Sequence, residues 1–325
     1  MPQLPPPSSA PSRARKQAVA PAPTRARASF PPSAPSRARE QAAAPIHTVA
    51  IVGVGLIGGS FALALRSAGF SGELLGVSSD AAIQAGLESG AISRRATLEE
   101  AVRAAQLIYL AQPVDRILET IEALGRLEPS RCLITDAGST KAVIVQKALE
   151  CLHAETFLGG HPLAGKEQRG AQAADASLFR NRPYILTPTA PVTPLSKDFR
   201  EWLSRIGANA IEMSPSQHDS IVAFTSHLPQ LLSTALAGTL AKQDKPQLAE
   251  VFGSGLLDMT RLAMSAPEIW SAILATNQAE VLAATDAFLD SLRELRESIL
   301  AGSSEKYFTL AGVFSAKLRK PPSTT

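Results

Sequence analysis

Three glycines in the segment Gly53-Val54-Gly55-Leu56-Ile57-Gly58 lie between two segments of opposite character. The preceding run, residues 48–52, predicts a strand, and residues 60–68 predict a helix. In this context the first glycine makes a tight turn, the second admits a pyrophosphate close to the backbone, and the third lets helix and strand pack closely. The helix N-terminus adds N–H groups for the phosphates. The segment predicts a dinucleotide site with Gly53, Gly55, Leu56, Ile57 and Gly58 as contacts, the alternative being a turn that binds nothing.

Strand-like and helix-like segments alternate from residue 47 to about residue 212. Beyond the glycine motif, predicted strands lie at 73–78, 107–111, 132–135, 156–158 and 184–187, and predicted helices at 81–89, from Thr97, at 115–127 and at 141–152. Such alternation predicts a parallel sheet with right-handed crossovers.

After residue 214 the strand patterns stop. Apolar residues recur at helical spacing over 215–242, 247–264 and 268–300. We therefore predict an α/β fold, with a Rossmann-like, mostly parallel sheet domain at 46–212 followed by an all-helical dimerisation domain at 213–312. Residues 313–325 are predicted to be a C-terminal tail.

The first 45 residues differ in composition from the rest of the 325-residue chain. They hold 11 of the 24 prolines and seven of the 32 basic residues, against one acidic residue, Glu40. Such a Pro/Ala/Arg-rich segment buries too little apolar surface to offset its ordering entropy, so we predict a disordered tail. Its Arg and Ser content is also that of organelle transit peptides, although its prolines oppose the helix that such peptides form.

The remaining residues carry 25 basic against 28 acidic side chains, so the predicted folded part is slightly acidic and no nucleic-acid partner is expected. No apolar run approaches the roughly 18 residues of a membrane helix, so no membrane partner is expected either. Cys132 and Cys151 have no metal-ligand spacing, which predicts no metal site and a reducing, cytoplasmic location.

Ligands of parallel sheets bind at the carboxyl ends of the strands. The polar residues that follow the predicted strands are therefore the first candidates for a site: Ser78, Gln112, the motif Asp136-Ala-Gly-Ser139-Thr-Lys141 and His161 within Gly159-Gly160-His161-Pro162. A further motif, Thr225-Ser226-His227-Leu-Pro229, lies in the helical part.

Together with the glycine segment and Met259-Thr-Arg261, these motifs resemble the prephenate/arogenate dehydrogenase family of tyrosine biosynthesis, from residue 47 to about residue 310. The resemblance implies oxidative decarboxylation of prephenate or arogenate with NAD or NADP, and a homodimer. Another Rossmann-plus-helical dehydrogenase, of the β-hydroxyacid or pyrroline-carboxylate type, would not explain the Gly-Gly-His-Pro and Ser-His-Leu-Pro motifs. A non-catalytic nucleotide-binding module is the alternative from a different class.

His161 and Ser139 are the predicted catalytic residues. An imidazole of ordinary pKa, about 6.5, accepts protons near neutrality, and a histidine directly after a strand can face a ligand. The resemblance implies that His161 takes the proton of the substrate's ring hydroxyl while hydride leaves the same carbon, with Ser139 beside that hydroxyl and the nicotinamide. From the residues alone, His161 could be a structural histidine in a turn and Ser139 a helix N-cap.

His227 and Arg261 are the predicted substrate-binding residues. A histidine in an apolar helix is more often a core residue, but the resemblance implies that His227 lines the substrate pocket. Arg261, flanked by apolar residues, needs a carboxylate, either Asp258 or the ring carboxylate of the substrate. Gln230 stands where many members of the family have a second histidine, which leaves substrate preference open.

The phosphate state of the cofactor depends on the end of the second strand, where NAD-specific sites place an acidic residue. Ser78 and Ser79 occupy that place, Asp80 follows, and no arginine is adjacent in the sequence. NAD and NADP are both compatible with this pattern.

Overall fold

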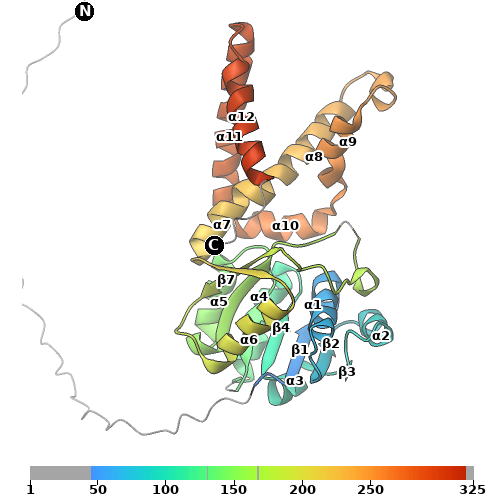
Figure 1. Ribbon diagram of the computed structural model, residues 1–325, viewed down its shortest axis with the longest axis vertical. Coiled ribbons are helices and arrows are strands. Elements are labelled where there is room, and N and C mark those ends of the chain that lie inside the picture. The colour runs from blue at the N-terminus through green and yellow to red at the C-terminus, as the bar shows by residue number, and fades with distance from the viewer. Residues whose placement is uncertain (1–44, 130, 167, 320–325) are drawn as a thin grey trace, which may run out of the picture. The chain divides into compact units, whose positions relative to one another are not determined.

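The computed structural model describes residues 45–129, 131–166 and 168–319 (Figure 1). All but Pro45 of the predicted tail lies outside the described residues, so its disorder stays a prediction.

An eight-stranded sheet forms the first part of the described chain, in the order β3-β2-β1-β4-β5-β6-β7-β8. Its strands are β1 (Thr48–Val52), β2 (Glu73–Val77), β3 (Arg94–Arg95), β4 (Leu107–Leu110), β5 (Leu133–Asp136), β6 (Phe157–Pro162), β7 (Pro183–Pro188) and β8 (Asn209–Glu212). Strands β1 to β6 pair in parallel, β7 runs antiparallel to β6, and β8 is parallel to β7. The predicted mostly parallel sheet is confirmed, and β3 and β8 are additions to it.

Helices cover both faces of this sheet. They are α1 (Leu56–Ser67), α2 (Asp80–Glu88), α3 (Leu98–Ala104), α4 (Val114–Arg126), α5 (Ala142–Cys151) and α6 (Pro194–Arg205), with short 3₁₀ turns η1 (Ala154–Thr156) and η2 (Ala171–Ala173). Successive residues of β1 point to opposite faces, so Val49 and Ile51 join a core with α1, α2 and α6, whereas Ala50 and Val52 join one with α3, α4 and α5. This two-sided burial explains the continuous apolar runs of the central strands.

The helical part begins with α7 (Pro215–Val222) and runs to residue 318 (Figure 1). It continues through the π-helix η3 (Ala223–His227), α8 (Leu228–Ala241), η4 (Pro246–Ala249), α9 (Ser254–Thr260), η5 (Arg261–Met264), α10 (Pro267–Thr276), α11 (Gln278–Leu300) and α12 (Glu305–Leu318). The three long helices expected from periodicity are therefore each interrupted. The α12 helix also runs past residue 312 into the predicted C-terminal tail, which was expected to start at residue 313.

Two of these interruptions have local causes. Pro229 has no N–H for the carbonyl of Thr225, and the chain widens into the π-helix, where Leu228 N–H donates to the carbonyl of Ala223. Asn277, between α10 and α11, leaves helical geometry with φ −129° and ψ 30°. Both interruptions lie at residues of the site described below.

Among the residues that the structure describes, no helix is long and apolar enough to cross a membrane. The same residues contain no group of His, Cys, Asp and Glu side chains that could hold a metal ion. Cys132 and Cys151 are free thiols.

Candidate active site

The glycine loop has the geometry of a phosphate-binding turn. Gly53 has φ +97°, and a Cβ there would lie 2.5 Å from the carbonyl oxygen of Ala111. A Cβ on Gly58 would lie 2.1 Å from the carbonyl oxygen of Gly53, whereas one on Gly55 would meet no atom within 4 Å. Gly53 and Gly58 thus shape the turn, and Gly55 faces open space.

Helix α1 starts directly after this open space. It begins at Leu56 with Gly55 as its N-cap, and its first turn carries no acidic residue. Leu56 and Ile57 are half-buried against the core, so the unpaired N–H groups at the helix start are held in place. A dinucleotide pyrophosphate fits this combination of open space, N–H donors and positive helix end.

An arginine lies beside the end of β2, which the local sequence does not indicate. Strand β3 pairs with β2 so that Arg95 lies opposite Gly76, two residues before Ser78. Arg95 Nη1 is 2.6 Å from Asp80 Oδ1, and both side chains are exposed. Strand pairing therefore brings an arginine to the end of β2, although none is adjacent to Ser78 in sequence. An exposed ion pair of this kind is weak, so the guanidinium can exchange Asp80 for another anion.

Gln112 borders the glycine loop from the end of β4. Its Cγ lies 3.0 Å from the Cβ position at Gly53, and its Oε1 accepts a hydrogen bond from Thr120 Oγ1 at 2.8 Å. Gln112 therefore borders the glycine loop, and its contact with the cofactor stays a prediction.

A buried ion pair holds the loop between β5 and α5 against β6. Asp136 accepts hydrogen bonds from the backbone N–H groups of Gly138, at 2.8 Å, and Gly160, at 3.0 Å. Lys141 Nζ contacts the Asp136 carboxylate and donates to the carbonyl of Gly160 at 2.7 Å. Burial lowers the pKa of Lys141, and the carboxylate of Asp136 opposes that shift. The pair fixes the loop that carries Ser139.

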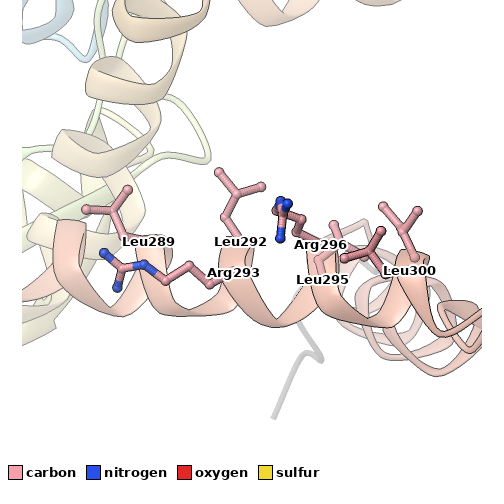
Figure 2. A pocket seen from close by; sticks show the side chains of 7 residues that line it. Leu289, Leu292, Arg293, Leu295, Arg296 and Leu300 are labelled. Carbon is pink, nitrogen blue, oxygen red and sulfur yellow. The ribbon is translucent and has the colours of Figure 1, made fainter.

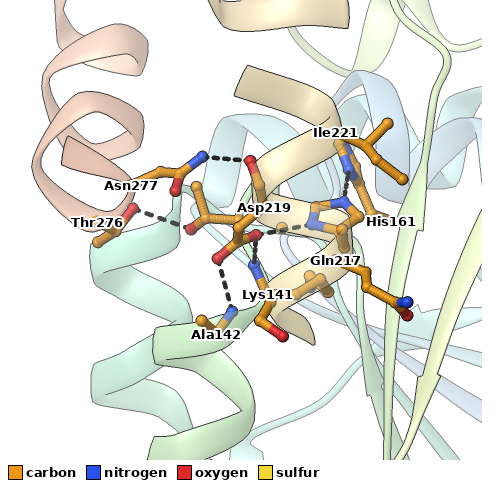
Figure 3. A network of polar contacts seen from close by, with 12 residues as sticks. Lys141, Ala142, His161, Gln217, Asp219, Ile221, Thr276 and Asn277 are labelled. Carbon is orange, nitrogen blue, oxygen red and sulfur yellow. Dashed lines mark hydrogen bonds and ion pairs between the residues drawn. The ribbon is translucent and has the colours of Figure 1, made fainter. Parts of the chain in front are cut away.

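His161 is buried and lies within β6, opposite Ile185, rather than after the strand as the sequence predicted. Its Nδ1 is 2.8 Å from Nε2 of His218 (Figure 3). Burial lowers the pKa of His161 well below 6.5, and charge on His218, Lys141 and His227 would lower it further. The imidazole is therefore uncharged at neutral pH, and the ordinary pKa expected from sequence is wrong.

The partner of His161 comes from the helical part, and sequence reasoning missed it. A capping box between Ser214 and Gln217 starts α7 and turns His218 and Val222, four residues apart, toward the interior. His218 Nδ1 is 2.7 Å from Oδ1 of Asp219, also buried. The spacing of His218 from apolar Val222 is the signal that could have indicated its burial.

Asp219 joins α7 to the start of α5 (Figure 3). Its carboxylate accepts hydrogen bonds from the backbone N–H groups of Lys141, at 2.7 Å, and Ala142, at 2.9 Å. Asn277 Nδ2 donates to the backbone carbonyl of Asp219 at 2.9 Å. The Ser139 loop, His161 and the first turns of the helical part thus form one network.

His227 is buried at the end of the π-helix. Its Nδ1 is 3.3 Å from Asn277 Nδ2, and its ring packs edge-on against Trp270 with centroids 5.9 Å apart. Burial lowers its pKa to about 4, and Asp219 opposes that shift. These contacts suit an interior histidine, and π-helices occur frequently at functional sites. Contact with substrate stays a prediction.

Arg261 lies exposed at the junction of α9 and η5. Gln230, on α8, donates from Nε2 to the carbonyl of Leu262 at 2.8 Å, and its Oε1 accepts from Ser265 Oγ at 3.2 Å. Gln230 thus fastens α8 to the turn next to Arg261. The substrate role of Arg261 stays a prediction.

Comparisons with known proteins agree with this arrangement. The family model described as "Prephenate dehydrogenase, nucleotide-binding domain" matches residues 61–212, and that described as "Prephenate dehydrogenase, dimerization domain" matches residues 214–312. The prephenate dehydrogenase of Bacillus subtilis is 32% identical over 268 residues, which cover 80% of this chain and 72% of that protein.

Two solved structures are similar along most of the described chain. A crystal structure of prephenate dehydrogenase from Aquifex aeolicus, in complex with hydroxyphenyl propionate and NAD+, has a TM-score of 0.78 at 30% identity and covers 84% of this chain and 98% of that one. The crystal structure of Synechocystis arogenate dehydrogenase has a TM-score of 0.70 at 28% identity, over 83% and 98%. The predicted architecture, the NAD(P) cofactor and the oxidoreductase class are confirmed. The chain belongs to the prephenate dehydrogenase family.

Proposed function

We propose that this chain oxidises and decarboxylates a cyclohexadienol carboxylate, prephenate or its amino analogue arogenate, in the synthesis of tyrosine. The observation that carries the proposal is the burial of the His161 imidazole beside the loop that holds Ser139, which lowers the pKa of that imidazole. Membership of the family supplies the substrate class, and the glycine loop supplies a place for the dinucleotide.

His161 accepts the proton of the ring hydroxyl in this proposal. Because its pKa is low, the imidazole is neutral across the physiological range and one ring nitrogen can accept. Ser139 donates to or accepts from the same hydroxyl and orients it. His161 then returns the proton to the phenolic oxygen of the product.

The chemistry supplied by bound NAD(P)+ is acceptance of hydride from the ring carbon that bears the hydroxyl. One electron pair leaves the ring with that hydride, and the pair of the broken C–CO2 bond enters it, so the ring becomes aromatic as carbon dioxide leaves. Aromatisation drives the reaction. The protein contributes chiefly position and electrostatics.

The substrate is an anion, and Arg261 is the proposed partner of its ring carboxylate. A planar guanidinium can hold a carboxylate through two parallel hydrogen bonds. His227 is proposed to line the same pocket from the π-helix.

For the cofactor, Arg95 and Ser78 favour acceptance of a 2′-phosphate beside β2, since an arginine at this place accommodates NADP. The absence of a carboxylate at Ser78 removes the usual partner of the NAD ribose. We expect NADP to be used at least as well as NAD.

The helical part supports a homodimer, as does the description of its family model. On α11, a pocket of about 450 Å³ is lined largely by leucines, including Leu289, Leu292 and Leu300 (Figure 2). On α12, Phe308 and Phe314 are 72% and 61% exposed. Apolar patches of this kind mark protein contacts. Sedimentation equilibrium should give twice the chain mass.

The two free thiols suit a reducing compartment, and we place the protein in the cytoplasm.

Steady-state assays with prephenate and arogenate, each with NAD+ and NADP+, test the function. At least one combination should yield one reduced cofactor and one carbon dioxide per aromatic ring formed. Reduced cofactor without carbon dioxide, or no turnover in all four assays, would contradict the proposal.

A further inference from the structure

We propose that His218 and Asp219 are positioning residues that decide which nitrogen of His161 accepts the proton. The three side chains form a buried line: His161 Nδ1 is 2.8 Å from His218 Nε2, and His218 Nδ1 is 2.7 Å from Asp219 Oδ1 (Figure 3). The inference rests on the proposed function for its catalytic consequence, whereas the hydrogen-bond arrangement itself can be measured without substrate.

The position of each hydrogen follows from the carboxylate end. A carboxylate oxygen accepts and does not donate, so the hydrogen between Asp219 and His218 sits on His218 Nδ1. The Nε2 atom of that neutral ring then has a lone pair and must accept from Nδ1–H of His161. The remaining nitrogen of His161, Nε2, is left with its lone pair and becomes the acceptor.

The Asp219 carboxylate is held in place, which fixes this order of hydrogen-bond donors and acceptors. Its carboxylate also accepts from the N–H groups of Lys141 and Ala142, at the start of the ten-residue helix α5. The positive end of a helix favours negative charge at this place. Through Asn277, which donates to the Asp219 carbonyl, α11 also supports the position of α7.

This line of hydrogen bonds from Asp219 through His218 to His161, called the relay, also balances charge when His161 is protonated. The groups facing His161 that oppose its protonation are His218, Lys141 and His227. Asp219 raises the pKa of His227, so its negative charge acts across this cluster. A hydrogen bond through His218 brings that charge to bear on the new imidazolium, which compensates in part for burial.

Asp219→Ala is the sharpest test, because it removes the oxygen shared by His218 Nδ1 and the N–H of Lys141. Without that acceptor nothing holds the hydrogen on His218 Nδ1. When His218 carries it on Nε2, His161 also carries its hydrogen on Nε2 and presents a donor where an acceptor is needed. We expect kcat to fall about 10²- to 10⁴-fold, the scale known for a mis-set tautomer, with KM and cofactor Kd within threefold.

Nitrogen NMR with labelled histidine rings reads the tautomers directly. The wild type should show Nδ1–H rings for His161 and His218, and Asp219→Ala should shift both rings toward Nε2–H. The matched control is Asp198→Ala on α6, whose carboxylate accepts from the N–H of Ile46 at 2.6 Å. It should retain the wild-type tautomers and kcat.

A second pair of variants keeps the test decisive if Asp219→Ala does not fold. In His218→Gln the amide oxygen can still accept from His161 Nδ1–H, so kcat should be at least tenfold higher than in His218→Phe, which offers no acceptor. Wild-type Nε2–H tautomers, or equal kcat in these two variants with matched melting temperatures, would overturn the relay. An inactive wild type with Nδ1–H tautomers would instead overturn the proposed function and leave the hydrogen-bond arrangement standing.

Discussion

The sheet part and the helical part of this chain bury their apolar residues to different extents. Among the described residues, four large apolar side chains are exposed before residue 213 and eighteen after it. The sheet closes its core with its own helices, whereas α9, α11 and α12 leave leucines and phenylalanines in contact with water. The sheet part therefore needs no second chain for its core, and the helical part has a surface that a second copy would cover.

The proposed chemistry lies where these two parts meet. The base is on β6, and its hydrogen-bond partner is on α7. A region with a closed core can hold a buried imidazole in one place, and the adjoining region can bring the groups that tune it. Substitutions in each part therefore have separable effects.

His161→Asn tests the chemistry assigned to the sheet part. Loss of one general base typically costs about 10²- to 10⁴-fold, and we expect kcat to fall by that factor. Affinity for the cofactor, measured by fluorescence titration, should change by less than threefold. A variant with kcat within threefold of the wild type would remove His161 from the mechanism.

Arg261→Ala tests the substrate contact assigned to the helical part. Arg261 is exposed, and a substrate carboxylate bound to it would cover the charge pair. Removing one side of a covered charge pair costs about 2–5 kcal/mol, so kcat/KM should fall roughly 30-fold to a few thousand-fold, mostly through KM. The competing role is a structural pair with Asp258. In that case, thermal melts would show comparable losses of stability in Arg261→Ala and Asp258→Ala.

The pH dependence of stability tests the burial of His227 in the helical part. Its pKa is lowered from 6.5 to about 4, so the neutral form is the one that the fold favours. The contribution of neutral His227 to the free energy of unfolding is complete above pH 6.5. It is lost as the pH falls from 6.5 toward 4. In urea titrations, the free energy of unfolding should fall by about 2–3 kcal/mol less over this range in His227→Gln than in the wild type. The same loss in both would contradict the assignment, and exposed His153→Gln is the control.

Ser78→Asp tests the cofactor end of the sheet part. A carboxylate here accepts from the ribose 2′-hydroxyl and repels a 2′-phosphate, so the NADP/NAD ratio of kcat/KM should fall on the order of a hundredfold. Arg95→Ala should lower the same ratio by removing a cation. Arg94→Ala is the control, since Arg94 pairs with Glu73. An unchanged ratio in both variants would place the 2′-phosphate elsewhere.

Leu292→Glu tests the exposed surface of the helical part. Leu292 is 49% exposed on α11, and burying a charge in a dimer contact is costly. We expect the dimer dissociation constant to rise roughly tenfold or more, since full burial of a leucine is worth about 1.5–3 kcal/mol, only about half of Leu292 is left to bury, and a twofold axis repeats the loss. Leu87→Glu, at a side chain 40% exposed on α2, should leave the dimer intact. Equal dissociation constants for both would refute the α11 surface.

Much of the sheet part was predictable because its signals are local. The glycine loop and the alternation of strand and helix depend on neighbouring residues, and both are confirmed. The position of Arg95 depends on the pairing of a two-residue strand with β2, which no local pattern indicates.

The hydrogen-bonded line from Asp219 through His218 to His161 was missed for a different reason. His218 and Asp219 read as polar residues in the first turns of a helix, and only the packing of α7 against the start of α5 buries them. That burial also lowers the pKa of His161, which its residue type alone placed near the ordinary value. Periodicity likewise could not reveal the π-helix before Pro229, since apolar spacing continues through it.

The dependence of kcat/KM on pH is the sharpest test of a buried and uncharged His161. This quantity reports the ionisation of the free enzyme. With the pKa of His161 well below 6.5, kcat/KM should be flat from about pH 6.5 to pH 8 and should decline only at lower pH. A rise through an apparent pKa between about 6.5 and 7.5, absent from His161→Asn, would show an ordinary solvated imidazole and contradict the account.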